Sequence, residues 1–429
     1  TMVRRQTSPR TRSKDRSRQR GRKQPRKRLL LESLESRRLL AADVGLERSP
    51  LVIDLPDHEA PHSYRMIVDE GAVLVWDELA DETLGRYPLE ETTAILVNGS
   101  PSPDELIIDF SGGEFGAPIQ FNGNEPESEP GDQLVLINGT TETITHEFSG
   151  PSSGSIELSG DSLTQMVSYE GLEPVIDNLD AVHRVFSFIG GTESIRLSDD
   201  GVAGDNVNVV DSSLGEVVTF LNPRDSLTIN AGSGDDLVEL DALDSLTSFS
   251  DLFVAGDDGA DDLRLYHLLS GISASLSGGS ETDVVSIGSS AGTLDSIMGT
   301  VTVDGGTETL TPAITGNLDV KSVNQIVSVA AGDQLIVNDS ANVVSGSFHV
   351  NETSVEKIGV ANILYAAVEE VEITTGVDGD TVAITRTAPS GYLEVSTGSG
   401  NDEVTIADTG DASLVVINTG NNDDVVAIE

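Results

Sequence analysis

Apolar and polar residues alternate in short runs along most of the chain, and turns rich in Gly and Asp separate the runs. The pattern is clearest where TGVDGDTVAI (375–384), TGSGNDEVTI (397–406) and TGNNDDVVAI (419–428) follow one another at intervals of 22 residues. Alternation predicts half-buried strands, and the Gly/Asp clusters predict turns. A fixed period of this kind is typical of a solenoid. We therefore expect an all-β fold, a parallel β-solenoid with rungs of about 22 residues.

An earlier block repeats less regularly. AGSGDDLVEL (231–240), AGDDGADDLRL (255–265) and GGSETDVVSI (278–287) place Gly232, Gly256 and Gly279 at intervals of 24 and 23 residues. Two longer stretches, GDQLVLING (131–139) and GDQLIVNDS (332–340), also resemble each other. We interpret this as a larger unit copied at least once, with a first β-repeat module over 73–310 and a second over 311–429. For residues 73–220, where the period is poor, the alternative is a β-sandwich of immunoglobulin or cadherin type.

Charge divides the chain into a basic leader and an acidic body. Residues 1–38 contain 15 of the 25 Lys and Arg residues but only 3 of the 72 Asp and Glu residues. We expect residues 1–28 to be a disordered basic leader and 45–72 to be a polar linker, because both contain few apolar residues. The acidic body is not expected to bind nucleic acid. No apolar run approaches the length of a transmembrane helix, so none is expected.

The segment after the leader carries a recognisable motif. LESRRLLAAD (34–43) resembles the LEPR-XLL motif near the N-terminus of very large planctomycete surface or secreted proteins, with Ser36 in place of Pro. We therefore interpret 29–44 as an export-associated motif. DFSGG (109–113) and FLNPRDSLTI (220–229) resemble the repeat modules of those proteins. The resemblance implies a secreted or cell-surface protein with a structural or adhesive role, whose partners are other cell-surface proteins or glycans.

The Gly/Asp turns are similar to the RTX, or haemolysin-type, repeat G-G-x-G-x-D-x-U-x, which binds calcium. Glycine allows backbone conformations that let carbonyl groups face a cation, and Asp adds a carboxylate. Calcium takes six to eight oxygen ligands, so adjacent turns would share an ion. We expect calcium as the cofactor; the alternative is an acidic turn that is only solvated. The predicted ligands are Asp235, Asp236, Asp262, Asp283, Asp378, Asp380, Asp402, Asp423 and Asp424.

Catalytic motifs are weak in this sequence. HEAPH (58–62) matches the zincin motif H-E-x-x-H, but Pro61 opposes the continuous helix that the zincin mechanism requires. We expect no zincin site there. The chain has no Cys, and the few basic residues of the body are not clustered. We expect a protein that is not an enzyme; the alternative is a β-helix that binds glycans or degrades polysaccharides.

The sequence stops at Glu429, directly after the expected inward residue Ile428 of the last rung. Solenoids need capping repeats, because an open rung presents unpaired backbone groups. We therefore expect the second module to be truncated and the chain to self-associate end to end.

Overall fold

The alternating runs form short β-strands throughout the part of the chain that the structure describes. The computed structural model describes residues 48–58, 60–124, 131–161, 163–307 and 332–429. Within these ranges there is no α-helix, and the two short 3-10 helices are Leu89–Glu91 and Phe110–Gly112. The predicted leader and export-associated motif lie outside the described residues. The predicted all-β class is confirmed.

The first strands of the described chain are longer and more varied than those that follow. They are β1 (Ser49–Asp54), β2 (His62–Asp69), β3 (Ala72–Asp77), β4 (Glu82–Pro88), β5 (Thr92–Asn98), β6 (Asp104–Asp109), β7 (Ile119–Asn122), β8 (Gln133–Gly150), β9 (Ser153–Ser159), β10 (Gln165–Glu170) and β11 (Val175–Phe188).

Shorter strands follow in the middle of the chain. They are β12 (Ser194–Asp199), β13 (Val207–Ser212), β14 (Val218–Leu221), β15 (Ser226–Asn230), β16 (Leu237–Leu240), β17 (Asp251–Asp258), β18 (Asp262–Leu265), β19 (Ser273–Ser280), β20 (Val284–Ile287) and β21 (Thr300–Thr307).

The strands after residue 331 include the most regular set. They are β22 (Gln334–Asn338), β23 (Ser347–Asn351), β24 (Ser354–Lys357), β25 (Ala361–Ala366), β26 (Glu370–Thr374), β27 (Thr381–Ile384), β28 (Tyr392–Ser396), β29 (Glu403–Ile406), β30 (Leu414–Asn418) and β31 (Val425–Ile428).

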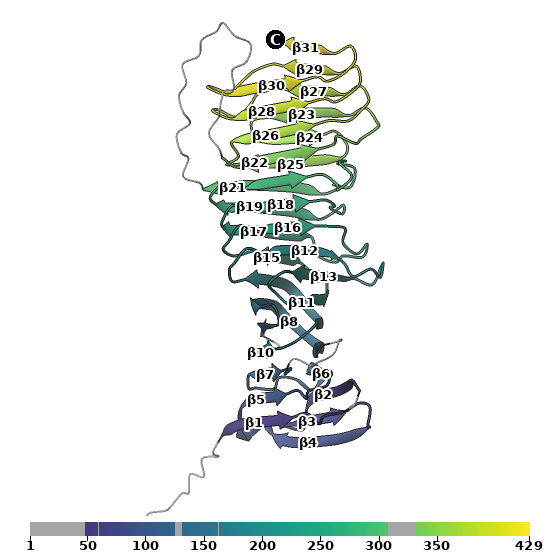
Figure 1. Ribbon diagram of the computed structural model, residues 1–429, viewed down its shortest axis with the longest axis vertical. Coiled ribbons are helices and arrows are strands. Elements are labelled where there is room, and N and C mark those ends of the chain that lie inside the picture. The colour runs from purple at the N-terminus through teal and green to yellow at the C-terminus, as the bar shows by residue number, and fades with distance from the viewer. Residues whose placement is uncertain (1–47, 59, 125–130, 162, 308–331) are drawn as a thin grey trace, which may run out of the picture. The chain divides into compact units, whose positions relative to one another are not determined.

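All these strands belong to one mostly parallel sheet of 31 strands, counted over the described residues. In the C-terminal part β26 pairs with β28 and β28 with β30, while β27 pairs with β29 and β29 with β31 (Figure 1). The register follows the sequence period: Val382 lies beside Val404, and Val404 beside Val426. Residues 22 positions apart are therefore neighbours in adjacent parallel strands, as the repeat predicts.

Antiparallel strands interrupt this pattern at several places. The ladders β2–β3–β4, β8–β9–β10, β12–β13–β14 and β23–β24–β25 are antiparallel. The region 73–220, where the sequence period is poor, contains three of these excursions wholly or in part. It also contains parallel pairs, such as β6–β8 and β8–β11. The insertions that form the antiparallel strands hide the period in the sequence.

Two predicted boundaries differ from the structure. The described part of the predicted linker 45–72 contains β1, β2 and the first residue of β3, because Tyr64 and Met66 supply buried apolar side chains within a polar stretch. The described residues on both sides of the predicted boundary at 310 belong to one compact unit, Leu46–Glu429. Strand β21 pairs directly with β25, so parallel pairing continues across that boundary.

The resemblance between 131–139 and 332–340 corresponds to the same local structure. Glu173 donates its backbone N–H to the Asp132 carbonyl at 2.7 Å, and Glu369 donates to the Asp333 carbonyl at 3.0 Å. Both contacts lie directly before a parallel strand of the sheet, β8 in one case and β22 in the other.

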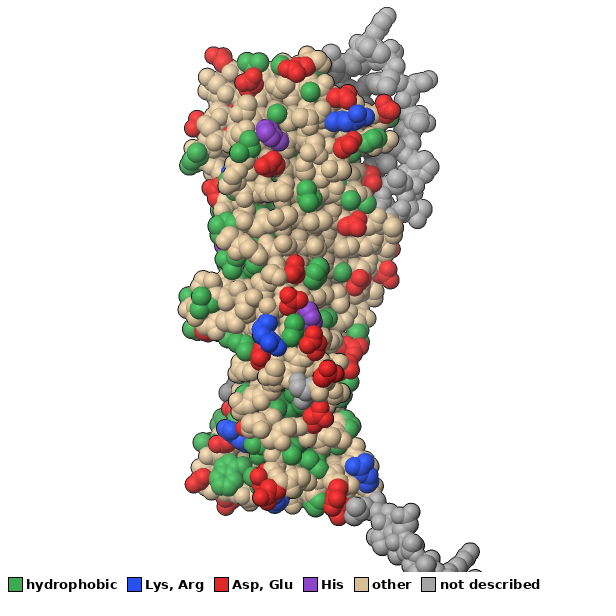
Figure 2. All heavy atoms as spheres, turned by 180° about the vertical axis from the view of Figure 1, so that it is seen from behind, with side chains coloured by type: hydrophobic (Ala, Val, Ile, Leu, Met, Phe, Trp, Pro, Cys, Tyr) green, Lys and Arg blue, Asp and Glu red, His purple; other side chains and the backbone are tan. Residues whose placement is uncertain are grey.

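One hydrophobic core runs through the described chain from Ile53 to Ile406 and is formed by alternate residues of the strands. In β27 and β29, for example, Val382, Ile384, Val404 and Ile406 are buried. The outward residues are largely polar, and acidic side chains are spread over the face shown in Figure 2. The sheet therefore keeps most of its apolar residues inside and exposes many acidic side chains on its surface.

Candidate functional sites

The Gly/Asp turns have the backbone conformation that their glycines predict. Gly232 and Gly234 have φ of 99° and 132°, and Gly398 and Gly400 have φ of 79° and 139°. These angles lie in the region that residues with a Cβ rarely adopt. Where the second glycine is replaced, Asn422 keeps the left-handed conformation with φ of 91°. At these positions the shape of the turn explains the glycines.

The last Asp of each turn forms a ladder of hydrogen bonds between neighbouring strands. Its Oδ1 atom accepts the backbone N–H of the corresponding residue in the preceding turn. We call this set the Asp ladder: Asp236, Asp261, Asp283, Asp333, Asp380, Asp402 and Asp424. The donor–acceptor distances are Glu193–Asp236 2.7 Å, Asp236–Asp261 2.9 Å, Asp261–Asp283 2.8 Å, Asp283–Asp333 2.8 Å, Asp380–Asp402 2.8 Å and Asp402–Asp424 3.1 Å.

Most of the Asp ladder is buried. Asp236 is 2% exposed, and Asp261 and Asp402 are each 1% exposed. The Oδ2 atoms of these three residues are buried and have no hydrogen-bond partner. Burial raises the pKa of Asp236, and burial together with the neighbouring Asp236 carboxylate raises the pKa of Asp261 to about 6. The carboxyl groups of the ladder thus connect adjacent turns through backbone N–H groups.

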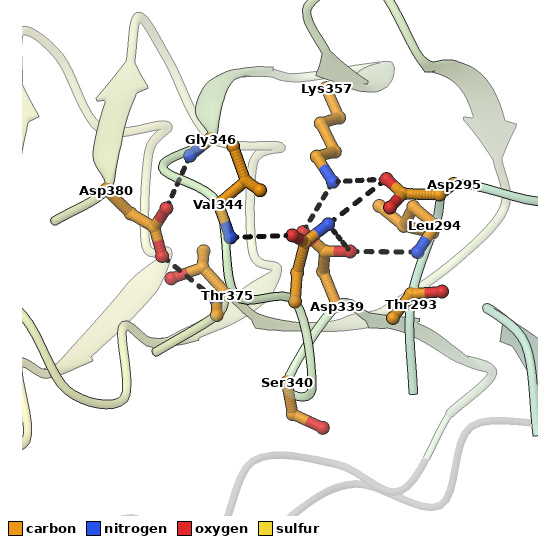
Figure 3. A network of polar contacts seen from close by, with 12 residues as sticks. Thr293, Leu294, Asp295, Asp339, Ser340, Val344, Gly346, Lys357, Thr375 and Asp380 are labelled. Carbon is orange, nitrogen blue, oxygen red and sulfur yellow. Dashed lines mark hydrogen bonds and ion pairs between the residues drawn. The ribbon is translucent and has the colours of Figure 1, made fainter. Parts of the chain in front are cut away.

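Asp380 begins the C-terminal part of the ladder and uses both of its carboxylate oxygens (Figure 3). Oδ1 accepts the N–H of Gly346 at 2.6 Å, and Oδ2 accepts the N–H of Gly376 at 2.9 Å. Next to it, the Nζ atom of Lys357 lies 2.8 Å from Asp339 and 3.1 Å from Asp295. Lys357 is only 6% exposed, so this basic residue of the body serves an internal ion pair.

The predicted calcium ligands fall into two groups in the structure. Asp236, Asp283, Asp380, Asp402 and Asp424 belong to the Asp ladder. The carboxylates of Asp235, Asp378 and Asp423 are exposed at the tips of the turns. Asp235 accepts the N–H of Ala260 at 3.1 Å, and Asp378 accepts the N–H of Gly379 at 3.0 Å. Within the described ranges, no three of the predicted ligands bring their carboxylate oxygens within 4.8 Å of one another.

Asp262 lies next to the ladder rather than in it. It is the first residue of β18 and pairs with Arg264 of the same strand. The ladder position belongs to Asp261, which sequence reasoning missed because AGDDGADD contains one residue more than AGSGDD between its first Gly and the ladder Asp. Asp333 was missed as well. The sequence feature that could have identified it is GDQ, which surrounds both Asp333 and Asp132. Oδ1 of Asp132 likewise accepts a backbone N–H, that of Asp104, at 2.7 Å.

The HEAPH segment does not form the helix of a zincin. His62 begins strand β2, and His58 lies in the loop before it. The two imidazoles nevertheless stack with ring centroids 3.6 Å apart, and both face Asp77 at the end of β3. Among the described residues, His58, His62 and Asp77 form a set of three ligand atoms that all lie within 4.8 Å of one another.

A family model described as Planctomycete extracellular matches residues 26–44 of the chain. No curated protein that was compared with the chain matches it. The described residues contain no helix that is long and apolar enough to cross a membrane. The family match covers the segment that carries the LEPR-XLL-like sequence and points to an extracellular protein similar to those of planctomycetes.

Proposed function

We propose that the chain is a non-enzymatic structural protein of the cell surface or the extracellular space, and that its described residues form a parallel β-solenoid. The observation that supports this most directly is the Asp ladder together with the parallel register of 22 residues. Along the ladder, neighbouring turns are bonded through carboxyl groups that are mostly buried, so these repeats stabilise their neighbours. Such one-dimensional stacking suits an extended scaffold.

The polar outer faces of the strands supply a surface for other cell-surface proteins or glycans, which gives the scaffold an adhesive role. Polysaccharide degradation is the alternative, since β-helix folds also carry enzymes. It is less well supported, because Lys357, the lysine of the body that the structure describes, is nearly buried between Asp295 and Asp339. Incubation of the purified chain with a panel of polysaccharides should release neither reducing ends nor unsaturated sugars.

Localisation of the full chain tests the proposal. The full chain and a variant that lacks residues 26–44 are produced in a planctomycete host, and both are traced by immunoblot in cytosol, envelope and medium. We expect the full chain in the envelope or the medium and the variant in the cytosol. A full chain that stays entirely in the cytosol would contradict an extracellular role.

Calcium stabilisation of the turns stays a prediction and needs a test that separates metal binding from the Asp ladder. Calcium should raise the Tm of the chain, while sodium at matched ionic strength should raise it much less. Asp402→Ala lowers the Tm with or without calcium, because it also removes the acceptor of the Asp380 N–H. The informative quantity is therefore the increase in Tm caused by calcium, compared between Asp402→Ala and the exposed control Asp408→Ala. The same Tm in chelator and in millimolar calcium would remove the metal hypothesis.

A further inference from the structure

The pair of histidines in HEAPH and Asp77 meet on the inner face of a β-hairpin. Strands β2 and β3 are antiparallel, and Tyr64 lies opposite Asp77 in their ladder. His62 is two residues before Tyr64, so its side chain leaves the strand on the same face as Tyr64. His58 comes from the loop that precedes β2. The hairpin and its preceding loop thus bring three ligand-type side chains together.

The distances between these side chains suit a small metal ion. The Nε2 atom of His62 lies 3.5 Å from Oδ2 of Asp77, and the Nε2 atom of His58 lies 3.9 Å from the same oxygen. In a tetrahedral zinc site with ligand distances of about 2.1 Å, neighbouring ligand atoms are about 3.4 Å apart. The atoms of His62 and Asp77 already lie near this separation, and those of His58 and Asp77 need to approach by about half an ångström. The two stacked rings, whose planes are 13° apart, would also turn so that both nitrogens point at the ion.

The carboxylate and the loop are held in place by other contacts. Oδ1 of Asp77 accepts the backbone N–H groups of Leu79 at 3.0 Å and Ala80 at 2.8 Å, which directs Oδ2 towards the histidines. The Tyr64 hydroxyl donates to the Pro56 carbonyl at 3.0 Å, and the Ser102 hydroxyl donates to the carbonyl of His58. Bonds of this kind orient the ligands of known metal sites.

One of the proposed ligand atoms lacks a hydrogen-bond partner. Nε2 of His58, which faces Asp77, is buried and has no hydrogen-bond partner. Buried polar atoms of native proteins are normally paired, and an unpaired one calls for an explanation such as a bound ion. His62 also lines a groove of about 300 Å³ together with Asp104 and Glu105. The groove thus reaches the site at His62, whereas His58 and Asp77 do not line it.

We propose that His58, His62 and Asp77 bind a divalent transition-metal ion of the zinc class, with water from the groove completing its coordination. Two imidazoles and one carboxylate are ligands that zinc prefers, whereas calcium and magnesium prefer oxygen alone. The site uses the two histidines of HEAPH in a loop and strand, without the helix of a zincin. The ion would tie the loop before β2 to the end of β3.

Two measurements on the full chain test this proposal. The metal-free chain is titrated with zinc by calorimetry, and the visible spectrum of the cobalt-substituted chain is then recorded. The variants are His58→Gln, His62→Gln and Asp77→Asn, and His349→Gln is the matched control because its side chain is exposed on β23. We expect one tight zinc site per chain, unchanged in the control. Each of the three other variants should lose affinity by about tenfold or more. An excess of calcium should leave the tight site occupied.

His58→Gln is the variant least expected to disturb folding, because His58 lies outside the strands and its replacement leaves β2 and β3 intact. Circular dichroism of the metal-free variants confirms that they fold. A chain that binds zinc only weakly at many acidic sites would overturn the proposal. Equal zinc affinity in the His58→Gln variant and the His349→Gln control would overturn it too.

Discussion

At the scale of single residues, the least expected feature is a charged group in the middle of the core. His146, Asp177 and Arg184 are all 0% exposed. Asp177 accepts hydrogen bonds from Arg184 and from Nε2 of His146, the latter at 2.8 Å, and its Oδ1 accepts the Leu179 N–H at 3.1 Å. Burial lowers the pKa of Arg184 to about 9, and burial followed by the nearby Arg184 charge lowers the pKa of His146. The sequence shows these residues only as isolated polar positions within apolar strands.

Asp177→Ala should destabilise the protein strongly. It leaves the Arg184 guanidinium buried without its carboxylate, which typically costs about 3–5 kcal/mol. The exposed pair Arg224–Asp180, whose charged atoms lie 3.0 Å apart, supplies the control. Asp180→Ala should cost at most about 1 kcal/mol. Denaturant unfolding of both variants measures the difference, and the double variant Asp177→Leu/Arg184→Met should recover most of the loss. Equal stability of the two single variants would show that the buried pair contributes nothing.

At the scale of the strand and turn, the sequence predicts most of the regular elements but not the role of the acids. Alternation located β27, β29 and β31, because each apolar residue there has an equivalent 22 positions away. The antiparallel excursions, such as β2–β3, could not be found from a repeat because each occurs in one place. The hydrogen bonds of the Asp ladder join residues that the sequence shows only as members of a motif. The same Gly/Asp pattern serves either a metal ion or a backbone N–H, and only the folded turn distinguishes the two.

Gly400→Ala should destabilise the turn between β28 and β29. Gly400 has φ of 139°, and a Cβ atom there would lie 2.6 Å from the backbone of Asp378 in the neighbouring turn. A residue forced into such a conformation costs about 1–3 kcal/mol, and the close contact adds to this cost. Ser399→Ala is the control, since Ser399 is a half-buried residue of the same turn whose replacement leaves the glycines in place. Thermal unfolding should show a lower Tm for Gly400→Ala alone. Similar Tm values for both variants would mean that the turn relaxes easily.

At the scale of the whole molecule, two features make the stability depend on pH. The chain has a formal net charge of −47, and the fold buries some of its carboxyl groups. Burial raises the pKa of Asp132 and of Glu193 to about 7, and the charge of the neighbouring Asp104 or Asp236 adds to the effect. An Asp or Glu of an unfolded chain has a pKa of about 4. Between these values the folded chain binds more protons than the unfolded chain. Its free energy of unfolding therefore falls as the pH rises through this window.

The Tm of the full chain should accordingly be higher near about pH 5 than near about pH 8. Self-repulsion of the acidic surface produces a change in the same direction, so a variant must separate the two effects. Asp261→Asn keeps the oxygen that accepts the Asp236 N–H but removes a buried titrating group whose pKa is about 6. Asp225→Asn removes the same charge from an exposed carboxylate. We expect a smaller loss of Tm with rising pH for Asp261→Asn than for Asp225→Asn. Parallel Tm curves for the two variants would mean that surface repulsion alone sets the pH dependence and that the Asp ladder stays ionised at no cost to the fold.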